Sequence, residues 1–204
     1  MTISLVDYKA GNLTSVRKAL AAIGADVSVP ASPRELERAA GVIVPGVGHF
    51  GATRALDREW VDAIRSRVVA GRPLLGICLG LQWLFEGSDE APDLPGLGLL
   101  AGRCRRLPGN ASNGGAVKIP HVGWNSLSFE RRAPITEGVP PDSQVYFTHS
   151  FVAPVTADTV AVTEHGERFA AVVSRDLVAG VQFHPEKSGE VGLQVLRNFL
   201  RLAG

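Results

Sequence analysis

An apolar run that ends in a cysteine between two glycines constrains the fold of this chain more than any other feature. The run is Leu74-Leu75-Gly76-Ile77-Cys78-Leu79-Gly80. A nucleophile flanked by glycines at this spacing is typical of a sharp turn from a strand into a helix. Glycine lets the backbone pass close to itself, and the positive end of the helix favours a thiolate over a thiol. The pattern therefore predicts a buried strand, a helix after it, and a catalytic nucleophile, Cys78, between them.

Short apolar runs alternate with helical patterns through the first half of the chain. A length of 204 residues with 45% hydrophobic side chains suits one α/β domain, residues 1–204. The rhythm predicts an open, mostly parallel twisted sheet with helices on both faces, as in flavodoxin-like folds. The second half has strand-like runs without long helices between them, so we expect an added antiparallel or mixed portion of the sheet. Those runs are residues 97–107, 118–129, 144–152, 159–163 and 169–174.

Several local patterns predict where individual elements begin and end. We expect one long helix over residues 52–70, and a shorter helix opened by a capping box at Ser32 and Glu35. Ser188 is the expected N-cap of the last helix. The Gly- and Asn-rich residues 108–115 predict a mobile surface loop.

Charge and cysteine content limit the kinds of partner and compartment. The chain has 21 basic and 20 acidic side chains, a formal net charge of +1, which gives no reason to expect nucleic acid or an anionic membrane surface. No apolar run reaches the roughly 18 residues of a membrane span, and the first residues lack the pattern of a secretory signal. We expect a cytoplasmic protein in which both cysteines, Cys78 and Cys104, are free thiols.

A second motif supplies the base that a thiolate nucleophile requires. His184 and Glu186 follow the apolar run 177–183, with Pro185 between them. Proline keeps the preceding residue extended, and in extended chain residues two apart point the same way. The carboxylate can then orient the imidazole, as the acid does in a serine-type triad. Both motifs follow predicted parallel strands, so we expect Cys78 and His184 at the same edge of the sheet.

Acyl transfer also requires donors for an oxyanion. The glycine-rich segment after the third predicted strand contains Gly46, Val47 and Gly48. With the backbone N–H of Leu79, the Gly48 region predicts a two-donor oxyanion hole. A phosphate loop is the other interpretation of such a segment, but the Lys-Ser/Thr of a P-loop is missing.

Together these motifs resemble the class I, triad-type glutamine amidotransferases. The resemblance rests on Gly-Ile-Cys-Leu-Gly-Leu-Gln at 76–82 and Phe-His-Pro-Glu-Lys-Ser at 183–188. Further segments are similar to the glutaminase subunits of imidazole glycerol phosphate synthases: 7–8 and 11–13, 45–48, 118–125 and 146–151.

The resemblance implies hydrolysis of glutamine to glutamate and ammonia without a cofactor or metal. By the family's pattern Cys78 attacks, His184 moves the proton, and Glu186 orients the imidazole. The ammonia would pass to a separate (β/α)₈-barrel cyclase subunit, which makes imidazole glycerol phosphate and an aminoimidazole carboxamide ribotide in histidine biosynthesis. The implied glutamine-binding residues are Gln82, His149, Ser150 and Phe151, and the implied partner-facing residues are Asn12, Pro120, Val122, Trp124, Tyr146 and Lys187. Val122 replaces a common methionine, and Phe151 replaces a common tyrosine and so lacks its hydroxyl.

Other functions share parts of this pattern. A glutaminase subunit of the vitamin B6 or aminodeoxychorismate pathway would use the same chemistry, although the 118–125 segment argues against it. A cysteine hydrolase without a partner would share the turn at Cys78 but would not need Gln82. A catalytically idle binding subunit would not need an intact Cys78, His184 and Glu186. The remaining histidines, His49, His121, His149 and His165, lie on separate segments without metal-ligand spacing.

Overall fold

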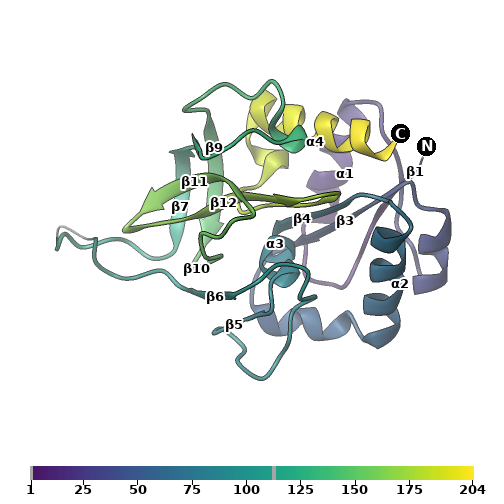
Figure 1. Cartoon of the computed structure of the whole chain (residues 1–204), viewed down its shortest axis with the longest axis horizontal. Helices are drawn as coiled ribbons and strands as arrows, with labels where there is room; N and C mark the ends of the chain where they lie inside the picture. Colours follow the sequence, from purple (N-terminus) through teal and green to yellow (C-terminus); the bar gives the residue numbers. More distant parts are fainter. Residues whose placement is uncertain (1, 112–113) are drawn as a thin grey trace.

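The computed structural model describes residues 2–111 and 114–204, and it is built on one eight-stranded sheet (Figure 1). Five parallel strands come first in the order β2-β1-β3-β4-β13, followed by antiparallel β12, β11 and β8. This confirms the predicted parallel sheet with an antiparallel addition. The strands are β1 (Thr2–Leu5), β2 (Asp26–Ser28), β3 (Gly41–Gly46), β4 (Leu74–Cys78), β8 (Ser128–Phe129), β11 (Thr159–His165), β12 (Glu167–Arg175) and β13 (Val178–Val181).

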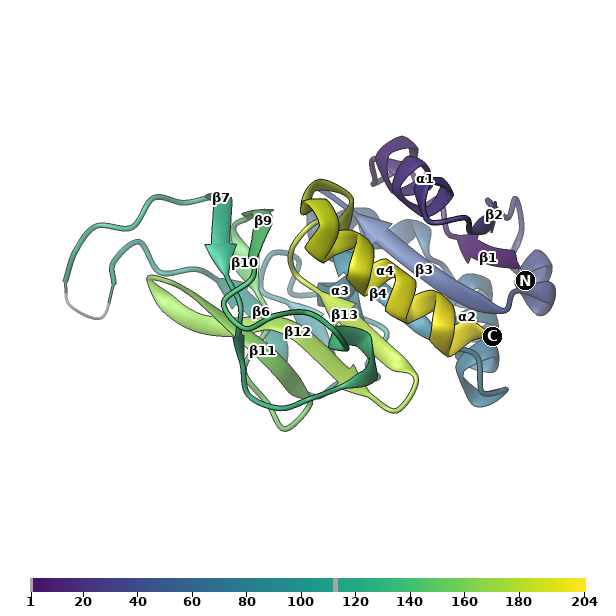
Figure 2. The same cartoon turned by 90° about the horizontal axis from the view of Figure 1, so that it is seen from above.

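Helices cover both faces of the sheet, as Figure 2 shows. On one face α1 (Leu13–Ala22) and α4 (Gly189–Ala203) pack in a core that includes Ile43, and on the other α2 (Arg58–Val69) and α3 (Leu79–Leu84) pack in a core that includes Val44. Alternate residues of β3 thus face opposite layers, which is why this central strand is apolar throughout. The described part of the chain also contains four 3₁₀ segments: η1 (Pro33–Arg38), η2 (Phe50–Ala55), η3 (Pro134–Thr136) and η4 (Pro185–Lys187).

Two smaller sheets pack beside the main one. One is the antiparallel ribbon of β7 (His121–Ser126) and β9 (Gln144–His149), and the other has the order β10-β6-β5, with β5 (Gly87–Ser88), β6 (Arg103–Arg106) and β10 (Phe151–Val152). The ribbon is fastened to the segment after β13. The Tyr146 carbonyl accepts from the His184 N–H at 2.9 Å, and the Tyr146 N–H donates to the Ser188 hydroxyl at 3.0 Å. The ribbon therefore forms a wall beside His184.

Strand order places three loops at one edge. The strands β3, β4 and β13 are neighbours and parallel, so the segments after Gly46, Cys78 and Val181 leave the sheet from the same end. The order 2-1-3-4-5 of the five parallel strands is the flavodoxin-like one, in which ligands bind outside the carboxyl ends of the strands. The fold therefore predicts a site at this edge.

The structure corrects four of the local expectations. Residues 52–70 are not one helix, because Asp57 accepts from the N–H groups of Glu59 and Trp60 and so starts α2 after the separate η2. Only Arg103–Arg106 of residues 97–107 forms a strand. The Ser32 hydroxyl donates to Glu35 instead of capping a backbone N–H, and the segment is the 3₁₀ turn η1.

Ser188 is also used differently from the expectation. Its hydroxyl makes no cap bond to α4 but donates to the His184 carbonyl at 2.6 Å and accepts from Tyr146. Ser188 is thus the N-cap residue of α4 by position, and its carbonyl accepts from the Gly192 N–H at 3.2 Å, but its hydroxyl holds the histidine loop against β9. The predicted mobile loop at 108–115 includes residues 112 and 113, which lie outside the described residues.

Within residues 2–111 and 114–204, none of the helices combines the length and the apolar character needed to cross a bilayer.

Candidate active site

The turn at Cys78 has the strained geometry that the glycine pattern predicts. Cys78 ends β4 and precedes α3 with φ +53° and ψ −106°, a backbone conformation that a residue with a side chain rarely adopts. A Cβ on Gly76 would lie 2.5 Å from the Gly80 carbonyl oxygen, and one on Gly80 would lie 1.8 Å from the Val44 carbonyl oxygen. Both glycines are therefore required by the close approach of β4, α3 and β3. Strain of this kind costs about 1–3 kcal/mol and is concentrated at functional sites.

The strain gives a prediction for stability. Cys78→Gly is expected to be more stable than Cys78→Ala by about 1 kcal/mol, because glycine adopts this positive φ without strain. At an ordinary helical position the order is reversed, so Ala21→Gly on the exposed side of α1 is expected to lose about 0.5–1 kcal/mol. Urea unfolding of the three variants measures the differences. A Cys78→Gly variant less stable than Cys78→Ala would contradict the strain.

His184 and Glu186 form a buried pair beside this turn. The His184 backbone is extended, with φ −96° and ψ 99°, and its Nδ1 lies 2.7 Å from Glu186 Oε1. Each side chain is 2% exposed. A carboxylate can only accept, so His184 Nδ1 carries the hydrogen and Nε2 is left toward the nucleophile.

The electrostatic surroundings favour the charged form of His184. Burial lowers the pKa of His184, but the nearby Cys78 sulfur and the hydrogen-bonded Glu186 carboxylate raise it to about 10. The sulfur acts on this ring although no aligned hydrogen bond joins it to Nε2, which has no partner among the described residues. Such bonds are often loose before substrate binds and tighten in the reacting complex. An imidazolium opposite a thiolate is the arrangement that activates a cysteine nucleophile.

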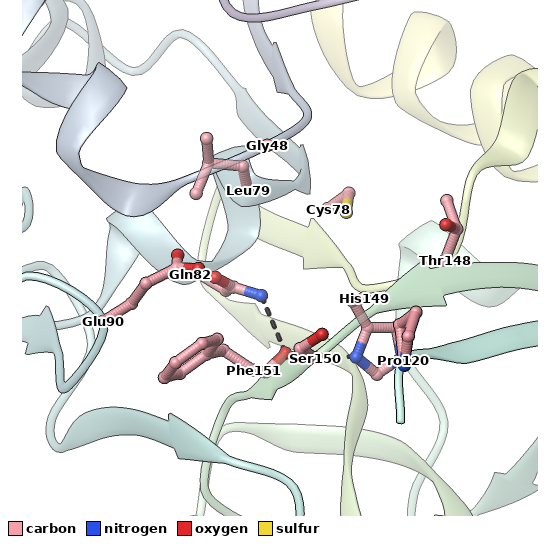
Figure 3. A pocket seen from close by; sticks show the side chains of 10 residues that line it. All are labelled: Gly48, Cys78, Leu79, Gln82, Glu90, Pro120, Thr148, His149, Ser150 and Phe151. Carbon is pink, nitrogen blue, oxygen red and sulfur yellow. Dashed lines mark hydrogen bonds between the residues drawn. The ribbon is translucent and has the colours of Figure 1, made fainter. Parts of the chain in front are cut away.

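A pocket of about 320 Å³ opens in front of Cys78 (Figure 3). In this view Gln82, Glu90 and Phe151 lie on one side of it and His149 and Pro120 on the other. The residues that line it are Gly48, Cys78, Leu79, Gln82, Glu90, Pro120, Thr148, His149, Ser150 and Phe151. Sequence reasoning named eight of these ten, and missed Glu90 and Thr148.

The glycine-rich segment reaches the pocket through Gly48, whose φ is +88°. Leu79 is the first residue of α3, so its N–H has no intrahelical acceptor. The Val47 N–H donates to the Ala10 carbonyl at 2.8 Å and is not available to a ligand in this conformation. The structure therefore brings Gly48 and Leu79 to the pocket, but Gly46 and Val47 belong to its supporting backbone.

Gln82 has a fixed orientation in the pocket wall. Its Nε2 donates to the Phe151 carbonyl at 2.8 Å and to Gln182 Oε1 at 3.2 Å, which uses both of its hydrogens. The Gln82 Oε1 atom is then the group left for a ligand. Phe151 contributes its carbonyl, so the hydroxyl that a tyrosine would carry is not needed for this contact.

Glu90 is the only acidic residue among those that line the pocket. Its Oε2 accepts from the Phe50 N–H at 2.6 Å, which holds the carboxylate in place. A carboxylate in this position can bind an ammonium group. No sequence pattern points to it, because Glu90 lies in an irregular segment between β5 and β6.

Three histidines that are far apart in the sequence gather at the pocket wall, where His149 lines the pocket and the other two lie beyond it. In the β7–β9 ribbon His121 is paired with His149, and His165 stacks on His121 with ring centroids 4.0 Å apart. The His149 Nδ1 atom must donate to the Phe151 carbonyl at 3.1 Å, because a carbonyl only accepts. His121 Nδ1 then donates to His149 Nε2 at 3.1 Å, and Asn125 Nδ2 donates to His121 Nε2 at 3.3 Å. Each of the four ring nitrogens of His121 and His149 then has a hydrogen-bond partner while both rings are neutral.

Because both buried rings are neutral, the free energy of unfolding is expected to depend on pH. Burial lowers the pKa of His149 to about 3 and that of His121 to about 4, and the neighbouring histidines add to both effects. Below the ordinary value of about 6.5 the unfolded chain therefore binds protons that the folded chain does not. Stability is expected to be complete above this pH and to fall as the pH drops from about 6.5 toward about 4, where the folded chain begins to bind the protons too, by up to about 1.4 kcal/mol per pH unit for each histidine.

Urea unfolding across that range measures how the free energy of unfolding changes with pH. His149→Gln is expected to reduce this slope by the contribution of one proton, about 1.4 kcal/mol per pH unit. The titration of His184 does not interfere, because its raised pKa affects stability only above about pH 6.5. An unchanged slope in His149→Gln would contradict the neutral chain of bonds.

Three of the side chains that the resemblance places at a partner, those of Val122, Trp124 and Tyr146, belong to the β7–β9 ribbon. Val122 is 55% exposed and Trp124 is 57% exposed. Trp124 meets Tyr146 edge to face at 6.1 Å, and the Lys187 ammonium lies 5.6 Å from the centre of the Tyr146 ring. Asn12 is exposed at the start of α1, and exposed Pro120 also lines the pocket. A protein partner would cover large exposed apolar side chains of this kind.

Comparison with known proteins adds an independent line of argument. The family model for class-I glutamine amidotransferases matches residues 4–203. A protein named imidazole glycerol phosphate synthase subunit HisH from Geobacillus thermodenitrificans is 47% identical, over 97% of this chain and 94% of that protein. One of the same name from Gloeobacter violaceus is 49% identical, over 98% of this chain and 89% of that protein.

Solved structures show the same fold at low sequence identity. A crystal structure of a glutamine amidotransferase has a TM-score of 0.75 at 23% identity and covers 98% of both chains. The structure of PurLQS from Thermotoga maritima has a TM-score of 0.76 at 21% identity, over 98% of this chain and 97% of that one.

Proposed function

This chain belongs to the class-I glutamine amidotransferase family, and on that premise we propose that it is the glutaminase subunit of an imidazole glycerol phosphate synthase. It hydrolyses glutamine and delivers ammonia to a separate (β/α)₈-barrel cyclase in histidine biosynthesis. One observation carries the proposal: Cys78, His184 and Glu186 leave neighbouring parallel strands at one edge of the sheet, beside a pocket. The names of the relatives support the choice of pathway over the vitamin B6 and aminodeoxychorismate alternatives.

Residues 1–204 act as one domain in this proposal, which the family match over 4–203 supports. Both cysteines are free, which suits the reducing conditions of the cytoplasm, where we place the enzyme. The reaction uses no cofactor.

The chemistry proceeds through a covalent intermediate. The Cys78 thiolate attacks the side-chain amide carbon of glutamine and forms a tetrahedral oxyanion. The carbon–nitrogen bond then breaks as the His184 imidazolium gives its proton to the leaving nitrogen, which releases ammonia and leaves a γ-glutamyl thioester. Water attacks the thioester and gives a proton to His184, and glutamate leaves as the thiolate re-forms. Glu186 orients the imidazole and stabilises its charged form.

The pocket contacts assign further roles to its polar groups. The N–H groups of Gly48 and Leu79 bind the oxyanion. Glu90 binds the α-ammonium group of glutamine, Gln82 presents its free oxygen to the substrate, and the backbone of His149 to Phe151 holds the remainder. The bond from Val47 to Ala10 represents a resting form of the loop, and the partner with its ligand favours another. Glycines at 46 and 48 make such a change inexpensive in energy.

The partner covers the exposed face formed by Val122, Trp124 and Tyr146, with Asn12, Pro120 and Lys187 at its edge. Because Pro120 also lines the pocket, ammonia released at Cys78 has a short way to this face. The shared location supports delivery from one subunit to the other without loss to water.

The proposal is tested by adding a purified barrel cyclase and its ribonucleotide substrate to the chain. Ammonia release from glutamine is expected to rise by at least about 100-fold over the isolated chain, since a population shift of a few kcal/mol produces such a factor. The two proteins are expected to elute together in size-exclusion chromatography. Full turnover by the chain alone would contradict the resting loop, and a complex that hydrolyses no glutamine would contradict the function.

A further inference from the structure

Gln182 is a fully buried polar residue next to the nucleophile, with an exposed fraction of 0%. The strands β13 and β4 are parallel and in register, with Val181 beside Ile77, so Gln182 and Cys78 follow as neighbours. The Gln182 Nε2 atom donates to the Cys78 sulfur at 3.6 Å. Its backbone N–H donates to the Ala171 carbonyl at 2.8 Å. Gln182 is the first residue after β13, and its bond to β12 holds it with its amide against the sulfur.

The direction of these bonds follows from the neighbouring side chain. Gln82 Nε2 donates to the Phe151 carbonyl, which can only accept, and also to Gln182 Oε1 at 3.2 Å. Gln182 must therefore present its oxygen to Gln82 and its nitrogen to Cys78. The sulfur faces a donor, and a donor favours a sulfur that carries negative charge over a neutral thiol.

We propose that Gln182 is a positioning residue for the nucleophile: its amide hydrogen stabilises and aims the Cys78 thiolate, and its amide oxygen fixes the orientation of Gln82 in the pocket. Gln182 does not line the pocket, so it acts through Cys78 and Gln82 and not on the substrate. The consequence for turnover rests on the proposed function, whereas the contact with the sulfur does not.

Two substitutions separate this role from packing. Gln182→Glu keeps an acceptor for Gln82 but removes the donor and places a carboxylate against the sulfur. Gln182→Met keeps the length and shape of the side chain without charge or donor. The matched control is Gln144→Glu on β9, where the side chain is exposed.

The readout is the rate at which iodoacetamide alkylates Cys78 as a function of pH, followed by mass spectrometry of the whole chain. Gln182→Met removes a hydrogen bond to a charged acceptor and is expected to move the pH midpoint of alkylation upward. Gln182→Glu also places a like charge beside the thiolate, so its upward shift is expected to be larger, at least about one pH unit. Gln144→Glu is expected to leave the midpoint in place. Cys104 reports on folding, because it is 0% exposed and stays unreactive in a folded chain.

A midpoint within about 0.3 units of the original in a folded Gln182→Glu or Gln182→Met would overturn the proposal. If Cys104 becomes reactive in one of the two variants, that variant is misfolded, and the midpoint of the other variant tests the proposal. With the barrel partner present, Gln182→Met is also expected to lower kcat by at least about tenfold and to raise KM for glutamine through Gln82. If the original complex hydrolyses no glutamine, the proposed function fails while the shift in midpoint still tests the contact.

Discussion

Replacing Cys78 with alanine is expected to lower ammonia release from glutamine by about 10⁴-fold or more in the complex with the barrel partner. Without the sulfur no thioester forms, and the pocket can only bind glutamine beside a water molecule. The His184–Glu186 pair would stay in place, because its 2.7 Å bond does not involve the sulfur. Enzyme-coupled detection of ammonia measures the change.

The matched control is Cys104→Ala, the same change at the other cysteine. Cys104 is buried in β6, and burial raises the pKa of its thiol, so it is a poor nucleophile. Its sulfur donates to the Gln82 backbone carbonyl at 3.7 Å, a weak contact, and a loss of no more than a few-fold is expected. Undiminished ammonia release by Cys78→Ala would end the assignment of the triad.

Replacing Gly80 with alanine is expected to destabilise the chain by about 3–5 kcal/mol. The new methyl would lie 1.8 Å from the Val44 carbonyl oxygen, in the central strand β3, where the backbone is buried on both faces. Neither α3 nor β3 can move away without breaking the packing on both sides of the turn. Urea unfolding measures the loss, followed by the fluorescence of buried Trp83 in α3.

Gly109→Ala is the control for this substitution. A Cβ at Gly109 meets no atom within 4 Å, so a change within about 0.5 kcal/mol is expected. A Gly80→Ala variant as stable as Gly109→Ala would mean that β3 and α3 are not in the close contact described here.

The sheet and the turn at Cys78 could be predicted from local sequence. Each central strand is buried on both faces and therefore appears as an uninterrupted apolar run, and each parallel connection requires a helix. The glycines at 76 and 80, on either side of the nucleophile, indicated that backbones approach closely there, and the structure has these close approaches. The pairing of His184 with Glu186 was predicted, but the expected reason holds only for His184. Its backbone is extended before Pro185, whereas Pro185–Lys187 forms the 3₁₀ turn η4, and this turn brings Glu186 to the imidazole.

The second half was harder to predict, because its geometry depends on pairing between distant segments. The register of β7 with β9 places His121 opposite His149. The end of β11, bonded to β7 through Asn125 and the Glu164 carbonyl, brings His165 onto His121. In the sequence these histidines lie on separate segments. No group of three or more potential metal ligands is found among residues 2–111 and 114–204, and the donors and acceptors of His121 and His149 are used by each other and by their neighbours.

Residues that act through irregular backbone or through a buried amide leave little trace in a sequence. Glu90 enters the pocket from a segment without regular structure, held by the Phe50 N–H. Gln182 interrupts the apolar run 177–183 directly after β13, and a polar residue inside such a run is the one signal that could have identified it. The break between η2 and α2 at Asp57 had a signal too, since aspartate is a preferred N-cap.

The central claim is that Cys78, His184 and Glu186 act together at one rim of the sheet. A glutamine-mimicking electrophile tests it directly, with mass spectrometry of the labelled chain in complex with the barrel partner. One saturable adduct is expected on Cys78, suppressed by excess glutamine and slowed by about 100-fold or more in His184→Asn. An adduct that glutamine does not suppress, or a rate that His184→Asn does not change, would show that sulfur and imidazole do not work as a unit.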